Sequence, residues 1–230
     1  MNGAMLKVKN LSVDLAGEKI IQDLNFEVKE NETLILLGPN GAGKTVLLRA
    51  LLGFVPFKGE ISWRKGVRIS YVPQRVPLVR DFPLSLEDFF GLKKVSKERA
   101  KEYLGLVGMG DDSFLQKRID NLSSGQFQRV LIAWGLVGNP QVLLFDEPTA
   151  GIDLGGEETI YSLLAKLKKE KGLTVILVTH DLSLVYKEAD NVLCFNKKMF
   201  CQGKPREILT AQNLSELFGG EMSFYSHHHE

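Results

Sequence analysis

Short runs of consecutive apolar residues alternate along most of the chain with stretches of helical period. Nearly every position in these runs is apolar, which is typical of parallel strands covered on both faces. The runs lie at 33–37, 141–145 and 174–178. Helices are predicted at 46–52, which ends at Gly53 where a left-handed C-cap fits, and at 127–137. Strands interleaved with crossover helices predict an α/β fold with a mostly parallel sheet.

Two segments depart from this alternation. Residues 5–30 are interpreted as two antiparallel strands that meet near Ala16. Residues 76–121 contain a charged helical stretch at 96–107 and no strong strand. We therefore expect an N-terminal antiparallel β subdomain in front of the α/β core and a helical insert within it.

Length and composition narrow the class of protein. The chain has 230 residues, enough for one large α/β domain with a small insert. Its 29 basic and 28 acidic side chains leave a net charge of +1, so no positive field favours nucleic acid. The longest apolar run, 130–137, is far shorter than the roughly 20 residues of a spanning helix. The N-terminus has no apolar signal-peptide region, which argues against secretion.

The two cysteines, Cys194 and Cys201, are too few for a disulfide framework or a structural zinc cage. This count favours a reducing cytosol as the compartment.

A glycine-rich segment at 38–45 fits the pattern G-x-x-x-x-G-K-[ST] between a predicted strand and a predicted helix. Such a loop wraps backbone N–H groups around a polyphosphate, and glycines keep side chains out of the way. Lys44 would place its charge on the β- and γ-phosphates, and the Thr45 hydroxyl can ligate Mg²⁺. The alternative is a chance glycine turn. The predicted nucleotide-contacting residues are Gly38, Pro39, Asn40, Gly41, Ala42, Gly43, Lys44, Thr45 and Val46.

Two carboxylates, Asp146 and Glu147, follow the apolar strand at 141–145. An uncompensated buried charge is costly, so both are expected at the exit of the strand. There Asp146 can hold Mg²⁺ and Glu147 can act as general base on an attacking water. The alternative interpretation is an acidic pair that only caps a helix N-terminus.

His180 and Gln74 follow two further strand-like runs, at 174–178 and 68–72. Open α/β sheets gather their ligand groups at the carboxyl ends of parallel strands. We therefore expect both side chains to converge with Lys44 and the carboxylate pair at one sheet edge. Gln74 could reach the metal or the water there; it could equally be a polar loop residue.

A second possible anion site lies at the start of the helix 127–137. Ser123 and Gly125 offer a hydroxyl and backbone donors at that helix N-terminus. The residues alone favour an ordinary N-cap. If the site is functional, its phosphate most economically comes from another copy of the protein, because the chain has one lysine cradle.

In type and order these motifs resemble those of ATP-binding cassette (ABC) ATPases, the nucleotide-binding subunits of transporters. The resemblance covers essentially the whole chain and implies a P-loop NTPase core at 1–75 and 122–215, a helical subdomain at 76–121 and a C-terminal tail at 216–230. The segment 38–45 resembles the Walker A motif, Gln74 the Q-loop, and Val142–Glu147 the Walker B motif. The signature motif is matched by Ser123, Ser124, Gly125 and Gln126, the D-loop by Asp153 and the switch by His180.

The resemblance also implies a mechanism. Two cassettes dimerise head to tail, and each ATP lies between the Walker A motif of one chain and the signature of the other. Glu147 is then the catalytic base, His180 contacts the γ-phosphate, and Asp153 couples the two sites. The segment 76–121 docks on the membrane-spanning subunits.

Three positions depart from the family pattern. Ser124 stands where glycine is usual, so a hydroxymethyl group lies near the partner's phosphate. Val46 stands where Ser or Thr is common, which removes a hydroxyl from the α-phosphate. Leu15 stands where an aromatic residue usually stacks on adenine, and such stacking is worth about 1–3 kcal/mol per base.

Further segments resemble the zinc and manganese importer cassettes: 72–75 with 81–88, 190–196 and 203–205. The chain also ends in Ser226-His227-His228-His229-Glu230. Neutral imidazoles ligate Zn²⁺, so this tail could bind metal. The other interpretation is a solvated tail, natural or appended, with no metal role.

The expected function is therefore an ATPase, with ATP and Mg²⁺, that drives a divalent-metal importer. The expected partners are a second copy of the chain, an integral-membrane permease and, indirectly, a substrate-binding protein; the expected location is the cytoplasmic face of the membrane. An importer of another cargo, such as iron complexes, stays open. A soluble cassette acting on nucleic acid is disfavoured, because the chain has no basic patch, zinc motif or second cassette.

A GTPase is disfavoured too. The segment 196–199 begins like a guanine-reading motif but lacks its aspartate. A nucleotide-gated scaffold without hydrolysis is disfavoured by the presence of Glu147.

Overall fold

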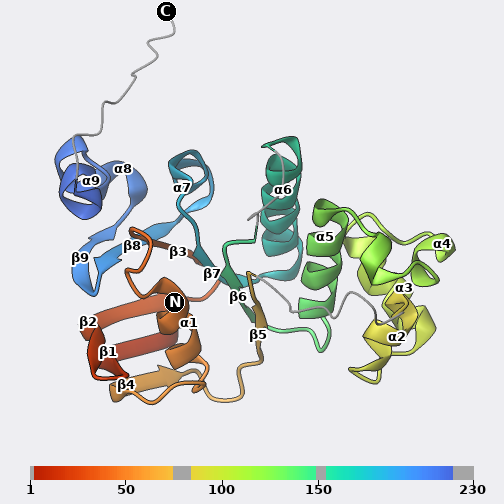
Figure 1. Ribbon diagram of the computed structural model, residues 1–230, viewed down its shortest axis with the longest axis horizontal. Coiled ribbons are helices and arrows are strands. Elements are labelled where there is room, and N and C mark those ends of the chain that lie inside the picture. The colour runs from red at the N-terminus through yellow and green to blue at the C-terminus, as the bar shows by residue number, and fades with distance from the viewer. Residues whose placement is uncertain (1–2, 75–83, 149–153, 220–230) are drawn as a thin grey trace, which may run out of the picture. The chain divides into compact units, whose positions relative to one another are not determined.

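The structure is a computed structural model that describes residues 3–74, 84–148 and 154–219, with the backbone alone at 154–159. Its contacts divide the chain into two compact units. The first unit consists of Met1–Arg64 and Leu177–Glu230, and the second of Lys65–Ile176. Figure 1 shows the elements of both, which are described here one unit at a time.

A three-stranded antiparallel sheet begins the first unit (Figure 1). Its order is β2-β1-β4, with β1 at Ala4–Leu15, β2 at Glu18–Lys29 and β4 at Lys58–Trp63. Ala16 and Gly17, which both have positive φ, form the two-residue turn between β1 and β2. The antiparallel strands expected at 5–30 are confirmed. β4 was not predicted, because its residues are mostly polar and none is buried.

The first unit also contains strands outside this antiparallel sheet. β3 (Thr33–Leu37), buried at every position, pairs in parallel with β8 (Asn191–Asn196). β9 (Lys198–Gly203) pairs with β8 in the antiparallel direction. The helices of this unit are α1 (Lys44–Leu51), α7 (Leu182–Glu188), α8 (Pro205–Ile208) and α9 (Ala211–Phe218).

Cys194 of β8 and Cys201 of β9 are direct cross-strand partners and form a disulfide. A single bridge is not a framework, but it runs against the reducing compartment that the cysteine count favoured, where disulfides are rare. The pairing was not predicted, because it depends on the register of a hairpin whose second strand the sequence pattern did not indicate.

The second unit pairs β5 (Ile69–Val72) with β6 (Val142–Asp146) in parallel. β7 (Thr174–Val178), buried throughout, begins in this unit. The helices of the unit are α2 (Leu86–Gly91), α3 (Lys97–Leu106), α4 (Asp112–Leu115), the 3₁₀ turn Ile119–Asn121, α5 (Ser124–Gly135) and α6 (Leu154–Lys171).

The helices of the segment 84–121 pack around a small apolar core of their own. Phe90 and Leu104 are fully buried there. Phe89 stacks on Trp134 of α5 with the ring centroids 5.3 Å apart, and the Lys93 ammonium lies 3.5 Å from the same indole. Burial of this ammonium lowers the pKa of Lys93. A helical insert is therefore present, as predicted.

The predicted fold class is confirmed: the chain is α/β, with an antiparallel sheet near the N-terminus and mostly parallel strands elsewhere. Within the described ranges, the structure holds no helix that combines the length and the apolar character needed to span a bilayer. The D-loop residue Asp153, the histidines of the tail and the segment 75–83 lie outside the described residues.

Candidate functional site

In the first unit, β3 leads into the glycine-rich loop and the loop into α1 (Figure 1). Gly38 cannot be replaced without movement, because an added Cβ would lie 2.2 Å from the carbonyl oxygen of Phe195. Gly43 has φ +99°, and a Cβ there would lie 3.1 Å from Ile20 Cγ2. Both glycines are therefore required by the loop's shape and by its close neighbours.

Lys44 reaches back into this loop. Its ammonium donates hydrogen bonds to the carbonyl oxygens of Gly38, at 2.8 Å, and of Pro39, at 2.9 Å. The side chain is 6% exposed, so the cation is held within the loop. A charge fixed in this way, beside a helix N-terminus that carries no side-chain cap, is suited to a polyphosphate.

The segment between β8 and β9 supports the same loop. Lys197 N donates to Ala42 O at 3.2 Å, and Lys197 O accepts from Gln22 N at 2.7 Å. The loop is thereby tied to β2 through one residue of the hairpin. This support was not foreseen, because it depends on tertiary contacts that no sequence motif marks.

His180 lies two residues beyond the end of β7, in the part assigned to the first unit, and is exposed. The next residue, Asp181, is the N-cap of α7 and accepts from Ser183 N at 2.8 Å and Leu184 N at 3.3 Å. His180 is thus placed at the start of a capped helix, at the carboxyl end of a strand, as the sequence predicted.

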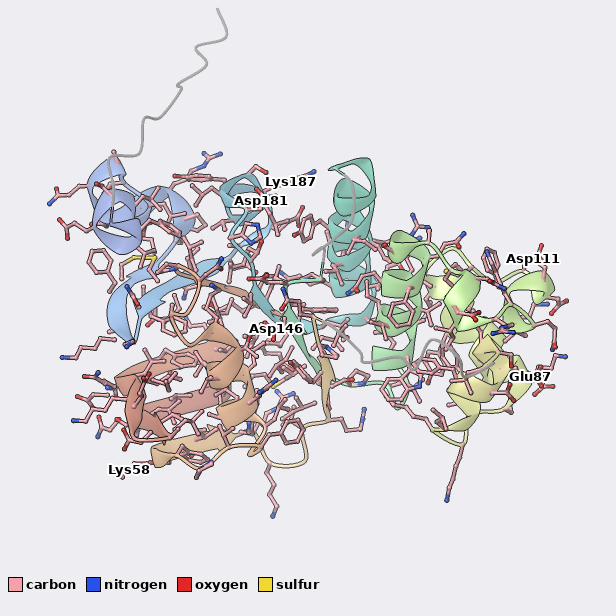
Figure 2. All side chains as sticks on the ribbon, in the orientation of Figure 1. Lys58, Glu87, Asp111, Asp146, Asp181 and Lys187 are labelled. Carbon is pink, nitrogen blue, oxygen red and sulfur yellow. A yellow bond between two sulfur atoms is a disulfide. The ribbon has the colours of Figure 1, made fainter. Side chains whose placement is uncertain are left out.

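In the second unit, Asp146 is the last residue of β6 (Figure 2). It is 3% exposed. Its Oδ2 accepts a hydrogen bond from the Tyr71 hydroxyl at 3.2 Å. Glu147 follows with φ +45°, a left-handed conformation that is rare for a residue with a side chain of this size. Gln74 Nε2 donates to Glu147 Oε2 at 2.8 Å. Gln74, Asp146 and Glu147 therefore gather at the ends of β5 and β6.

Ser123 is the N-cap of α5 in a reciprocal capping box. Its hydroxyl accepts from Gln126 N, and Gln126 Oε1 accepts from Ser123 N, both at 3.2 Å. Ser123 therefore caps the helix, and contact of this helix N-terminus with a phosphate stays a prediction. Ser123 and Ser124 are nonetheless exposed, and the Lys117 ammonium donates to Gln126 Oε1 at 3.2 Å. A positive charge thus lies beside this helix N-terminus, which the sequence analysis missed.

The structure brings the loop residues 38–46 together in the first unit and Gln74, Asp146 and Glu147 together in the second. The convergence of these two groups with each other and with His180 stays a prediction. The sequence motifs did not indicate Tyr71, although it belongs to β5 and lies near the carboxyl end of that strand.

The donor chemistry fits a magnesium ion. Mg²⁺ prefers hard oxygen ligands, and each unit offers one by itself: the first unit has the half-buried Thr45 hydroxyl and the second the buried Asp146 carboxylate. The part of the chain that the structure describes has no group of three or more His, Cys, Asp or Glu side chains able to hold a metal ion.

Comparison with known proteins gives consistent matches. The family described as "ABC transporter" matches residues 21–150. The "Zinc import ATP-binding protein ZnuC" of Pseudomonas entomophila is 35% identical over 235 residues, covering 100% of this chain and 91% of the relative. The protein of the same name from Yersinia pseudotuberculosis is 36% identical over 230 residues, covering 98% and 90%.

Solved structures agree. A chain from "an inward-facing conformation of a putative metal-chelate type ABC transporter" superposes with a TM-score of 0.84 at 29% identity, covering 94% of this chain and 90% of that one. The cbiO1 protein of Clostridium perfringens, described as part of the ABC transporter complex cbiONQ, gives a TM-score of 0.79 at 30% identity, covering 94% of both chains.

Proposed function

The chain belongs to the ABC transporter family of ATP-binding cassettes, and from that premise we propose that it is the ATP-hydrolysing subunit of a zinc importer or a closely related divalent-metal importer. The ATPase part rests chiefly on Lys44, whose ammonium is held inside the glycine-rich loop by the carbonyls of Gly38 and Pro39. The cargo rests on the relatives, which are named as zinc import proteins along the full length of this chain.

The proposed reaction is the hydrolysis of ATP to ADP and phosphate. Water attacks the γ-phosphorus, the bond from that phosphorus to the leaving oxygen of ADP breaks, and a proton of the water passes to a carboxylate oxygen of Glu147. Gln74 orients Glu147 through its hydrogen bond, while Lys44 stabilises charge on the β- and γ-phosphates. His180 is proposed to contact the γ-phosphate.

Thr45 and Asp146 are the residues proposed to hold Mg²⁺, with Gln74 as a further oxygen donor. The ion, when bound, neutralises charge on the phosphate oxygens. The role of the protein is to present oxygen ligands in fixed positions, and the buried, hydrogen-bonded Asp146 is suited to that role.

We propose that the functional form is a head-to-tail homodimer. Ser123, Ser124, Gly125 and Gln126 would then face the nucleotide bound by the partner's loop, and Asp153 would couple the two sites. The exposure of Ser123 and Ser124 and the nearby Lys117 ammonium support contact with an anion from outside the chain. The remaining proposed partners are an integral-membrane permease, contacted through 76–121, and indirectly a substrate-binding protein, with the chain peripheral on the cytoplasmic face.

A second cargo, a metal complex such as an iron chelate, is favoured by one observation. The metal-chelate type transporter superposes with a TM-score of 0.84. Uptake by vesicles that contain the chain with its permease and binding protein separates the two cargoes: labelled zinc is expected to accumulate with ATP, and an iron chelate is not.

The ATPase assignment is tested with Lys44→Ala. This variant should lose ATP binding, because the glycine-rich loop loses the buried ammonium of Lys44. Binding is measured with a fluorescent ATP analogue. The matched control is Lys58→Ala, which removes an exposed lysine paired with Asp14 at 3.2 Å on the surface of the antiparallel sheet. Equal binding by both variants would contradict the assignment.

A further inference from the structure

The Tyr71 side chain reaches along the neighbouring strand to the end of β6. Tyr71 is in register with Leu144, and Leu144 lies two residues before Asp146. Side chains two apart on a strand share a face of the sheet. The phenol and the Asp146 carboxylate therefore lie on one face, and the hydroxyl closes the offset with a 3.2 Å hydrogen bond to Oδ2.

This hydrogen bond acts on a carboxylate whose orientation matters in the proposed site. Asp146 is 3% exposed, and a buried carboxylate requires donors that offset its lost hydration. A donor fixed on a neighbouring strand also selects one rotamer of the carboxylate, because Tyr71 is anchored by the β5–β6 pairing. The position of Asp146 is thus set by β5 as well as by its own strand.

We propose that Tyr71 is a positioning residue for the metal-holding carboxylate of Asp146. The inference rests on the proposed function, in which Asp146 holds the Mg²⁺ that accompanies ATP. Partners that hydrogen-bond to a metal ligand orient it, and their loss typically weakens metal binding about 10–100-fold. Tyr71 would contact neither the nucleotide nor the ion; it would act through Asp146.

The test uses Tyr71→Phe in the full-length chain, which removes one hydroxyl and keeps the ring. Mn²⁺ serves as the probe, titrated by electron paramagnetic resonance in the presence of a non-hydrolysable ATP analogue. We expect the Mn²⁺ dissociation constant to rise about tenfold. Binding of the analogue in excess chelator should stay unchanged, because the glycine-rich loop and Lys44 are untouched.

Steady-state kinetics provide a second readout. The Mg²⁺ concentration for half-maximal ATP hydrolysis should rise in Tyr71→Phe, while the turnover at saturating Mg²⁺ should largely recover. A purely structural role would lower turnover without shifting the metal requirement. The matched control is Tyr186→Phe, which removes a phenol hydrogen bond of 2.9 Å to Leu209 O in the first unit and should leave the metal requirement unchanged.

A double-mutant comparison tests whether Tyr71 acts through Asp146. In an Asp146→Asn background, Tyr71→Phe should cause no further loss of Mn²⁺ affinity, because the carboxylate through which it acts is gone. Wild-type Mn²⁺ affinity in Tyr71→Phe would overturn the proposal, because the hydroxyl would then have no effect on metal binding. Unfolding of that variant would also overturn it, because the hydroxyl would then act in folding stability. If instead the wild-type chain neither bound nor hydrolysed ATP, the proposed function itself would fail.

Discussion

Gln74 Nε2 donates a 2.8 Å hydrogen bond to Glu147 Oε2, which links the second residue after β5 to the first residue after β6. The two residues were predicted separately, one as a possible metal or water contact and one as a general base. Their contact means that the orientation of the proposed base depends on the segment that follows β5. A change in that segment would therefore alter the geometry of hydrolysis without touching the nucleotide.

Glu147→Gln should lower ATP turnover by about 10²–10⁴-fold, the usual contribution of general-base catalysis. ATP binding should be retained, because Lys44 and its loop are unaffected. Phosphate release measures the first quantity and equilibrium binding of a fluorescent ATP analogue the second. Turnover at the wild-type rate would show that another group takes the proton.

Gln74→Ala should also lower turnover, but by less than Glu147→Gln, because it removes a group that orients the base and leaves the base in place. The comparison requires single-turnover kinetics at saturating Mg²⁺. A larger loss than that of Glu147→Gln would assign Gln74 a direct role in the chemical step.

Leu15→Tyr should tighten ATP binding. Leu15 is half-buried at the end of β1, and an aromatic ring stacked on a base contributes about 1–3 kcal/mol. The expected result is a dissociation constant at least about fivefold lower. Leu92→Tyr is the control, since Leu92 is 67% exposed in the second unit. An unchanged constant for Leu15→Tyr would show that adenine does not lie over residue 15.

The Glu147→Gln variant loaded with ATP should form a dimer of twice the 25.7 kDa chain mass, because its nucleotide persists between the two copies. Light scattering after size-exclusion chromatography measures this mass with and without ATP. Adding Lys44→Ala should abolish the dimer. A particle of single-chain mass at high protein concentration would contradict the proposal that the signature residues complete the partner's site.

The disulfide between Cys194 and Cys201 should lower the intact mass by about 2 Da relative to the reduced chain. It closes a short loop, with a sequence separation of 7, so its loss should cost about 2 kcal/mol of unfolding free energy in the loop-entropy account. Denaturant unfolding with and without a dithiol reductant measures the difference. Two alkylatable thiols in the non-reduced, denatured chain would rule the bridge out.

The sequence predicted the buried strands well. The run 174–178 coincides with β7, and 141–145 differs from β6 by one residue at each end. Continuous apolar runs indicate such strands because both faces are covered. β4 and β9 contain no fully buried residue, so apolar patterning could not reveal them.

The candidate site, like the fold, could be predicted from the sequence only in part. Its motif residues could be found because loops that bind phosphate constrain residue type at fixed spacing, as at Gly38 and Lys44. The contacts of Tyr71 with Asp146, and of Lys197 with Ala42, join residues far apart in the sequence. Such contacts depend on strand register and hairpin docking, which single-sequence patterns do not specify.

The positive φ of Glu147 limits which residues can replace it. Asn, Asp and Gly tolerate this conformation, whereas a β-branched residue such as Val or Ile does not. Copies of this gene that drift away from hydrolysis yet keep their fold should therefore lose the carboxylate through a narrow set of substitutions. Apparent constraint at position 147 would then persist after catalysis had been lost, as a record of backbone shape.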